Sequence, residues 1–145
     1  MEWFASKGAH IAVPVGHSPD WDFIAELGQR LLRVQVKTCI AFRHNRWEVS
    51  VCTRGGNQSW NGIVKRFDPT KCDYLFAVVA DGRRWCLPST ALQGGVRVLL
   101  GGPKYAEFEV EPGRPLPDPA VAESASTIDS LDPRGDVRAA KGARL

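Results

Sequence analysis

Three polar residues that could hold and use a metal ion lie close together in the sequence. Asp22 opens a stretch of alternating apolar and polar residues, and Gln35 and Lys37 follow within the apolar run Leu31 to Thr38. Side chains alternate along a strand, so Gln35 and Lys37 are expected to point to one face. A lysine in an apolar strand needs a partner, because an unpaired buried ammonium is costly. We expect the carboxylate of Asp22 to be that partner.

The same residues also fit an ordinary protein surface. Asp22 could end a turn, while Gln35 and Lys37 could form a solvated strand face. Spacing alone leaves both interpretations open.

An aspartate followed on the next strand by Gln35-Val36-Lys37 resembles the PD-(D/E)XK nuclease superfamily, in its branch related to group I intron homing endonucleases. That branch also uses Gln-x-Lys. The likeness covers roughly residues 1 to 110 and is carried by three stretches, Val13 to Phe23, Arg33 to Thr38 and Cys72 to Val78. The resemblance implies an α/β fold with a restriction-endonuclease-like core, in which helices flank a mixed central β-sheet. It also implies a metal-dependent endonuclease that hydrolyses phosphodiester bonds in double-stranded DNA.

The resemblance assigns the catalytic roles to Asp22, Gln35 and Lys37. Asp22 would be the anionic ligand of Mg²⁺ or Mn²⁺, and the Gln35 side-chain oxygen and the Val36 backbone carbonyl would be neutral ligands, since these ions prefer oxygen. Lys37 would position the attacking water or stabilise negative charge as it develops on the phosphate.

This pattern has one acidic residue fewer than the superfamily usually has, because Gln35 occupies the position where a second acid is common. In the family a helper acid lies on the first helix, and its usual spacing falls upstream of Met1. Glu2 and Asp73 are therefore candidates for additional site residues, although an aspartate before a strand is also a common turn residue. The missing acid favours an alternative function, a catalytically weak or inactive DNA-binding remnant of such a nuclease.

A polar, glycine-containing segment from Thr53 to Lys71 is long for a passive connection and is a candidate contact surface. Amide and cationic side chains can contact phosphates and groove edges. The predicted DNA-binding residues are Arg54, Asn57, Gln58, Lys65 and Arg66. An ordinary surface loop is the alternative. A homo-oligomer is predicted, because one such site cuts one strand of a duplex.

These residues must be positioned by strands and turns. Met1 to Lys7 is expected to be helical and to stop at Gly8, which favours a left-handed backbone. Two hairpins are predicted, one joined by Gly28-Gln29 and the other by Asp81-Gly82. The predicted strands are His10 to Val15, Trp21 to Leu27, Arg30 to Phe42, Trp47 to Cys52, Tyr74 to Ala80 and Arg84 to Leu87.

The sequence predicts one endonuclease-like domain over residues 1–111 and a disordered tail over residues 112–145. The tail is rich in proline and lacks aromatic residues, so it buries too little apolar surface to offset its ordering entropy. The four cysteines form no C-x-x-C pair, so we expect them to pack in the core rather than bind zinc.

Membrane insertion and secretion are not expected from this sequence. No apolar run approaches the roughly 20 residues of a membrane-spanning helix, and no basic stretch with an apolar leader follows Met1. The prediction is a cytoplasmic protein with no membrane partner. The net charge of +3 is compatible with a polyanionic partner but is shared by many other proteins.

Overall fold

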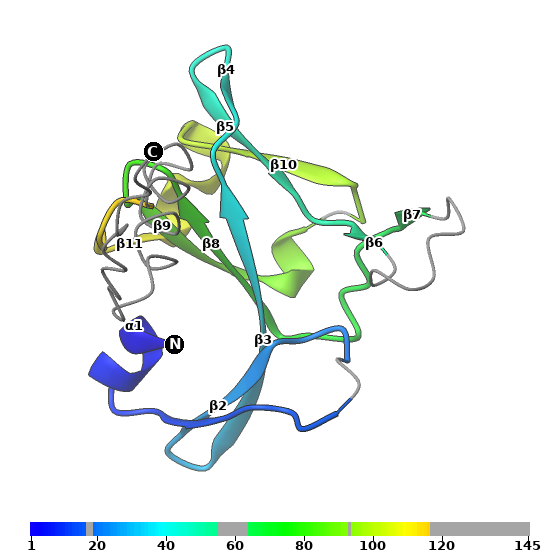
Figure 1. Cartoon of the computed structure of the whole chain (residues 1–145), viewed down its shortest axis with the longest axis vertical. Coiled ribbons are helices and arrows are strands. Elements are labelled where there is room, and N and C mark those ends of the chain that lie inside the picture. The colour runs from blue at the N-terminus through cyan, green and yellow to red at the C-terminus, as the bar shows by residue number, and fades with distance from the viewer. Residues whose placement is uncertain (17–18, 55–63, 93, 117–145) are drawn as a thin grey trace, which may run out of the picture.

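A six-stranded mixed sheet forms the centre of the protein, in the order β1-β2-β3-β8-β9-β11 (Figure 1). The computed structural model describes residues 1–16, 19–54, 64–92 and 94–116. The strands of this main sheet are β1 (His10–Ala12), β2 (Phe23–Leu27), β3 (Arg30–Cys39), β8 (Tyr74–Val79), β9 (Arg84–Pro88) and β11 (Glu109–Val110). The β3–β8 pair is parallel and the other pairs are antiparallel, so the mixed central sheet that the sequence predicts is present.

A smaller sheet and few helices complete the described part of the chain. The small sheet has the order β10-β5-β4, and β6 and β7 form a two-stranded ribbon. Their bounds are β4 (Phe42–Arg43), β5 (Arg46–Ser50), β6 (Thr53–Arg54), β7 (Val64–Lys65) and β10 (Arg97–Leu100). The helices are α1 (Glu2–Ser6) and the 3₁₀ turns η1 (Ser89–Ala91) and η2 (Pro103–Phe108).

The flanking helices that the resemblance implies are represented, within the described residues, by the single short α-helix α1. The small sheet covers the other face of the main sheet. None of the described helices combines the length and the apolar character that crossing a membrane would require.

Both predicted hairpins form, and glycines make their turns. β2 and β3 are joined through Gly28, whose φ of 62° lies in the left-handed region, and β8 and β9 are joined through Gly82 with φ of 89°. Glycine adopts this region without the steric penalty that a Cβ imposes. Two of the strands, β1 and β2, are shorter than predicted. β1 ends at Ala12 and β2 begins at Phe23.

The predicted strand Arg30 to Phe42 is wrong at its carboxyl end. β3 stops at Cys39, and Phe42 belongs to the β4–β5 hairpin of the small sheet. The chain reverses at His44 and Asn45, which have φ of 49° and 58°. Two consecutive left-handed residues match the twist of the flanking strands, and asparagine tolerates this conformation.

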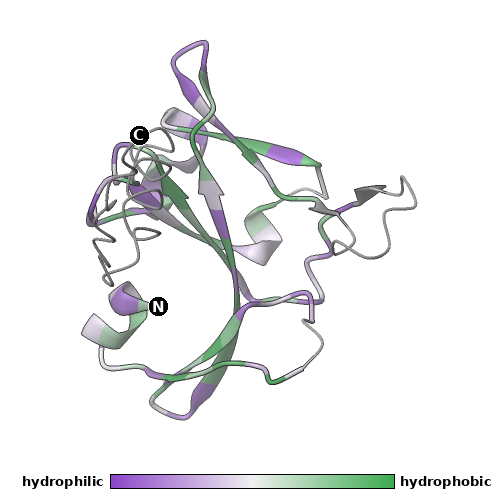
Figure 2. Ribbon diagram, in the orientation of Figure 1, coloured by the Kyte–Doolittle hydropathy of each residue, from purple (hydrophilic) through white to green (hydrophobic). Residues whose placement is uncertain are grey.

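Two hydrophobic cores lie on opposite faces of the main sheet. The first core is between α1 and the sheet, where the ring of Phe4 packs 5.3 Å from Phe23 and 5.4 Å from Phe76. The second core is between the two sheets, with Trp85 fully buried at its centre. Figure 2 shows hydrophobic residues along the strands and hydrophilic residues at the tips of the β2–β3 and β4–β5 hairpins.

Residues 112–116 follow β11 along the β8–β9 turn. The Gly113 amide donates to the carbonyl of Gly82, and the Leu116 amide donates to the carbonyl of Ala80. A Cβ on Gly82 would lie 2.5 Å from the carbonyl oxygen of Gly113, so the two backbones are in close contact. The predicted boundary at residue 111 therefore falls inside this contact, while the rest of the predicted tail, 117–145, lies outside the described residues.

Candidate functional site

Gln35 and Lys37 lie on the face of β3 that carries the second core. Their register partners on β8 are Leu75 and Ala77, both of which belong to that core. Val36 points the other way and packs against the first core. The alternation that the sequence predicts therefore places the two polar side chains on one face, beside buried apolar residues.

Asp22 is held against β3 by two hydrogen bonds at the point where β2 leaves it. β2 pairs with β3 only as far as Phe23 opposite Val34. The Asp22 amide then donates to the Val34 carbonyl over 2.8 Å, and the Asp22 Oδ2 accepts from the Val36 amide over 2.6 Å. A side-chain oxygen thus replaces the backbone acceptor that a longer β2 would provide.

The carbonyl of Val36 points to the same edge of β3 as its amide, because the N–H and C=O of one strand residue share a direction. The exposed carboxylate of Asp22 lies at that edge. The predicted anionic ligand and the predicted backbone ligand are thus brought together.

Gln35 is a buried polar residue, with only 7% of its surface exposed. Its side chain makes no hydrogen bond to any residue in the part of the chain that the structure describes. The fully enclosed side-chain atoms without a partner in the described chain are Trp47 Nε1 and Trp85 Nε1, so the Gln35 amide is still reached by solvent and is open to a water or a ligand. Lys37 is half-buried and likewise has no hydrogen bond or ion pair with a described residue. Gln35 and Lys37 therefore stand side by side without partners among the described residues, and the predicted pairing of Lys37 with the Asp22 carboxylate is not formed.

Three carboxylates and one guanidinium lie near the buried thiol of Cys72. Burial raises the pKa of the Cys72 thiol to about 11, and the negative charges of three carboxylates add to the shift while Arg33 opposes it. These carboxylates belong to Asp73, Asp20 and Asp22. Asp20 lies two residues before Asp22 and is not among the predicted site residues.

Asp73 is occupied by a structural contact. Its Oδ2 accepts from the backbone amide of Arg33 over 2.7 Å and from Arg33 Nε over 3.1 Å, and its Oδ1 accepts from Arg33 Nη2 over 3.0 Å. The guanidinium of Arg33 holds the pKa of this carboxyl below its usual range. Asp73 therefore joins β3 to the start of β8, next to the point where their parallel pairing begins, and both of its oxygens are already engaged.

Glu2 lies in the first turn of α1, exposed, on the helix that packs over the first core. Gln35 and Lys37 point to the opposite face of the sheet. The structure thus brings Asp22 into contact with Val36, which lies between Gln35 and Lys37 in β3, and leaves Glu2 on the other side of the sheet.

The predicted DNA-contact residues are only partly within the described chain. Arg54 and Lys65 lie in β6 and β7, which pair with each other, and Arg66 follows β7 and is exposed. Asn57 and Gln58 lie outside the described residues. The two-stranded ribbon extends away from the main sheet (Figure 1).

A metal site made only of histidine, cysteine and acidic side chains is not present within the described residues, where no three such groups gather. A divalent cation at Asp22 would depend on neutral oxygens as well. The amide of Gln35 and the carbonyl of Val36 are of the type that Mg²⁺ and Mn²⁺ accept. The donor set therefore fits a hard cation, with one carboxylate to neutralise it.

Comparisons with known proteins identify the fold. No family model and no curated protein matches the sequence. Among solved structures, the chain is similar to the bacterial homing endonuclease I-Ssp6803I, with a TM-score of 0.56 and 16% sequence identity over 74% of this chain and 76% of that chain. At this identity the likeness shows a shared fold, a mixed α/β arrangement similar to that of a homing endonuclease, and leaves the predicted restriction-endonuclease-like core as a prediction.

Proposed function

We propose that this protein is a metal-dependent DNA endonuclease of the PD-(D/E)XK type, with its site at Asp22, Gln35, Val36 and Lys37. The observation that carries the proposal is the contact of the Asp22 carboxylate with Val36, between Gln35 and Lys37, whose side chains bond to no described residue. The fold is shared with a homing endonuclease, which supports the same reaction class.

In this proposal Asp22, the Gln35 amide oxygen and the Val36 carbonyl hold one Mg²⁺ or Mn²⁺. When bound, such an ion neutralises charge on the phosphate and makes a bound water more acidic. The chain itself performs two further tasks. Lys37 donates to the attacking water or to a phosphate oxygen, and its charge stabilises the negative charge that develops in the transition state. The buried apolar floor formed by Leu75 and Ala77 limits water around these groups, which strengthens their electrostatic effect.

Double-stranded DNA is the proposed substrate, and a homo-oligomer would place two such sites on its two strands. The ribbon β6–β7 and the segment around it would contact the duplex through Arg54, Asn57, Gln58, Lys65 and Arg66. These contacts extend the sequence prediction, and removal of the cations tests them.

The test compares plasmid nicking in Mg²⁺ and in chelator for the native chain and three variants. Asp22→Asn keeps an oxygen that can accept from the Val36 amide, so it should fold and retain DNA while losing most Mg²⁺-dependent nicking. Lys37→Ala should behave in the same way. Glu26→Gln, an exposed carboxylate change elsewhere on β2, is the matched control and should nick at the native rate. Native nicking rates in both site variants would refute the assignment.

A second measurement does not depend on activity. Mg²⁺ or Mn²⁺ should raise the melting temperature of the native chain, since a ligand that binds only the folded state stabilises it. The same ions should not stabilise Asp22→Asn.

One specific observation favours the alternative, a catalytically weak or inactive DNA-binding protein. Gln35 supplies no charge, and Glu2 lies on the helix over the opposite face. DNA retention without Mg²⁺-dependent nicking, in a chain whose melting temperature is unaffected by Mg²⁺ and Mn²⁺, would establish this alternative.

A further inference from the structure

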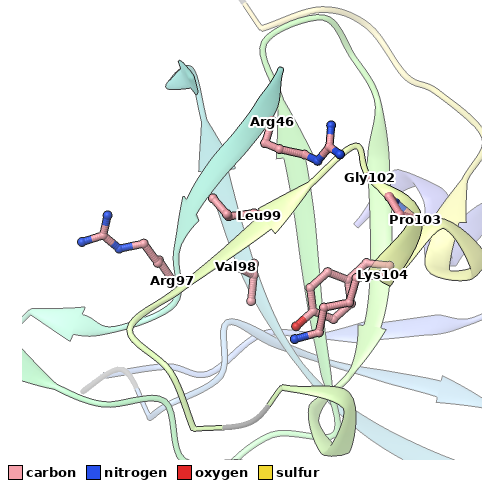
Figure 3. Close-up of a pocket in the computed structure, with 8 residues that line it drawn as sticks. Arg46, Arg97, Val98, Leu99, Gly102, Pro103 and Lys104 are labelled. Atoms are coloured by element: carbon pink, nitrogen blue, oxygen red, sulfur yellow. The ribbon is translucent and has the colours of Figure 1, made fainter. Parts of the chain in front are cut away.

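A basic hollow lies on the small sheet, apart from the residues of the proposed site (Figure 3). Its volume is about 470 Å³. Three cations come from three different elements, Arg46 from β5, Arg97 from β10 and Lys104 from η2. Leu99 and Tyr105 provide apolar and aromatic surface between them. Figure 3 shows the guanidinium of Arg46 and the ammonium of Lys104 at the rim of this hollow.

Two of the three cations have no acidic partner among the described residues. Arg97 is paired with Glu48 at 2.7 Å. Arg46 donates only to the carbonyl of Asn45, and the Lys104 ammonium lies 5.1 Å from the centre of the Tyr105 ring. Within the described residues the hollow therefore carries two positive charges without an acidic partner, and an anion bound beside either would form a charge-assisted hydrogen bond.

The position of Arg46 depends on a glycine. An ideal Cβ on Gly102 would lie 2.3 Å from Arg46 Nε and 2.7 Å from its Cζ, so the guanidinium rests against a backbone without a side chain. The backbone of Gly102 is extended, with φ of −120°, which alanine also adopts. An alanine at this position would thus displace the guanidinium without straining the turn and without changing any charge.

The hollow and the proposed site lie on the same side of the main sheet. Trp47, Val49 and Leu100 of the small sheet pack into the second core, which is on the face that carries Gln35. The Cys39 thiol donates to the carbonyl of Glu48, so β5 covers the Cys39 end of β3. The opposite surface of the small sheet, where Arg43 stands beside Arg46, points away from this core. The proposed site is on the face of the main sheet that the small sheet covers, and the hollow is on the outward surface of the small sheet, so a partner that contacts both must be much longer than a single phosphate.

We propose that the basic hollow binds a backbone phosphate of duplex DNA at a distance from the reaction centre. This inference rests on the proposed function for the identity of its partner. The cations are exposed or half-buried and are spread around apolar surface, which suits a sugar–phosphate backbone. Contacts of this kind add affinity without sequence preference and make binding depend on salt.

The experiment measures the affinity of the full chain for a duplex of mixed sequence in chelator, over a range of salt concentrations. The double variant Arg46→Gln/Lys104→Gln should weaken binding by roughly eightfold per lost contact at about 0.1 M salt, and the salt slope should fall by about 0.9 per contact. Gly102→Ala should weaken binding at unchanged net charge. Arg30→Gln, an exposed cation at the β2–β3 turn, is the matched control and should stay within twofold of the native affinity.

Circular dichroism and melting temperatures confirm that each variant folds. Native affinity in both the double variant and Gly102→Ala would overturn the inference. Stabilisation of the native chain, but not of the double variant, by inorganic phosphate, with duplex affinity unchanged between them, would also overturn it. Failure of the proposed function is a separate outcome. In that case the native chain does not nick DNA in Mg²⁺, yet its duplex affinity still falls in the double variant.

Discussion

The buried amide of Gln35 makes a prediction that separates stability from function. Full burial of an amide without a hydrogen bond costs about 1–3 kcal/mol relative to the same group in water, and the Gln35 amide, which is not fully enclosed, carries only the lower part of that cost. Gln35 is 7% exposed and has no hydrogen-bond partner among the described residues. Leucine has a similar volume and no polar group. Gln35→Leu should therefore raise the free energy of unfolding by about 1 kcal/mol, after allowance for an imperfect fit.

The expected change is measurable by thermal unfolding in chelator. For a domain of about 100 residues, 1 kcal/mol corresponds to roughly 4 °C in melting temperature. The same variant should lose stabilisation by Mg²⁺ and most Mg²⁺-dependent nicking, because the amide oxygen is a proposed ligand. A gain in stability with a loss of function is the result expected of a residue retained for its ligand.

Gln35→Glu provides the contrasting variant. A carboxylate at this position is buried near Asp22, so the melting temperature in chelator should fall, and Mg²⁺ should restore more stability than it adds to the native chain. If Gln35→Leu instead lowers the melting temperature by several degrees, the amide has a stabilising partner. The reasoning from its isolation would then be wrong.

Four further predictions concern the Arg33–Asp73 ion pair, the acid dependence of stability, the residues after Glu111 and the cations Lys65 and Arg66. Arg33→Leu should lower the free energy of unfolding by about 1 kcal/mol in denaturant titrations at neutral pH, a value reduced by the exposure of both partners. The pKa values of Asp73 and Glu111 are both lowered, by Arg33 and by Lys7 with Trp3, and that of Glu111 falls to about 2. This stabilisation is present above the unfolded-state pKa values of roughly 4 and is lost as pH falls towards 2. The melting temperature should therefore drop between these pH values. Glu111→Gln should make that drop smaller. An acid profile unchanged in Glu111→Gln would contradict this. Truncation after Leu116 should leave the melting temperature within about a degree of the native value. Truncation after Glu111 should lower the melting temperature by a few degrees, because it removes the contacts of Gly113 and Leu116 with the β8–β9 turn. Equal melting temperatures for the two truncated chains would show that these contacts are not stabilising. Lys65→Ala/Arg66→Ala should weaken duplex binding for all sequences and flatten its salt dependence, and an unchanged salt slope would remove this segment from the interface.

The sequence predicted the local parts of this fold well, because their signals are local. Gly28-Gln29 and Asp81-Gly82 mark the two hairpins, and the period-2 pattern of β3 determines which face carries Gln35. The proximity of Asp22 to Gln35 follows from the same hairpin. His44-Asn45 was an available turn signal, yet the apolar residues Ile40 and Phe42 on either side of Ala41 made one long strand the simpler prediction.

Contacts between distant residues were not visible in the sequence. The ion pair of Arg33 with Asp73 joins residues 40 positions apart, and no local pattern predicts it. Without that partner, Asp73 is indistinguishable from a site acid. The lack of any hydrogen bond to Gln35 and the seating of Arg46 on Gly102 are also tertiary facts, since each depends on which elements the fold brings together.

β3 lies between β2, which is antiparallel and adjacent in sequence, and β8, which is parallel and distant in sequence. This arrangement affects how the site assembles during folding. Asp22, Gln35 and Val36 all belong to the β2–β3 hairpin, and hairpins of this kind close within microseconds. β8 joins β3 only after a loop from Val34 to Tyr74 has closed, and non-local parallel pairing is slow. The spacing of the ligand atoms is thus a property of contacts within some 15 residues, whereas the dry floor beneath them arrives later with β8. Substitutions in β8 should therefore change how rapidly the site becomes sheltered from water while leaving the spacing of its oxygens unchanged.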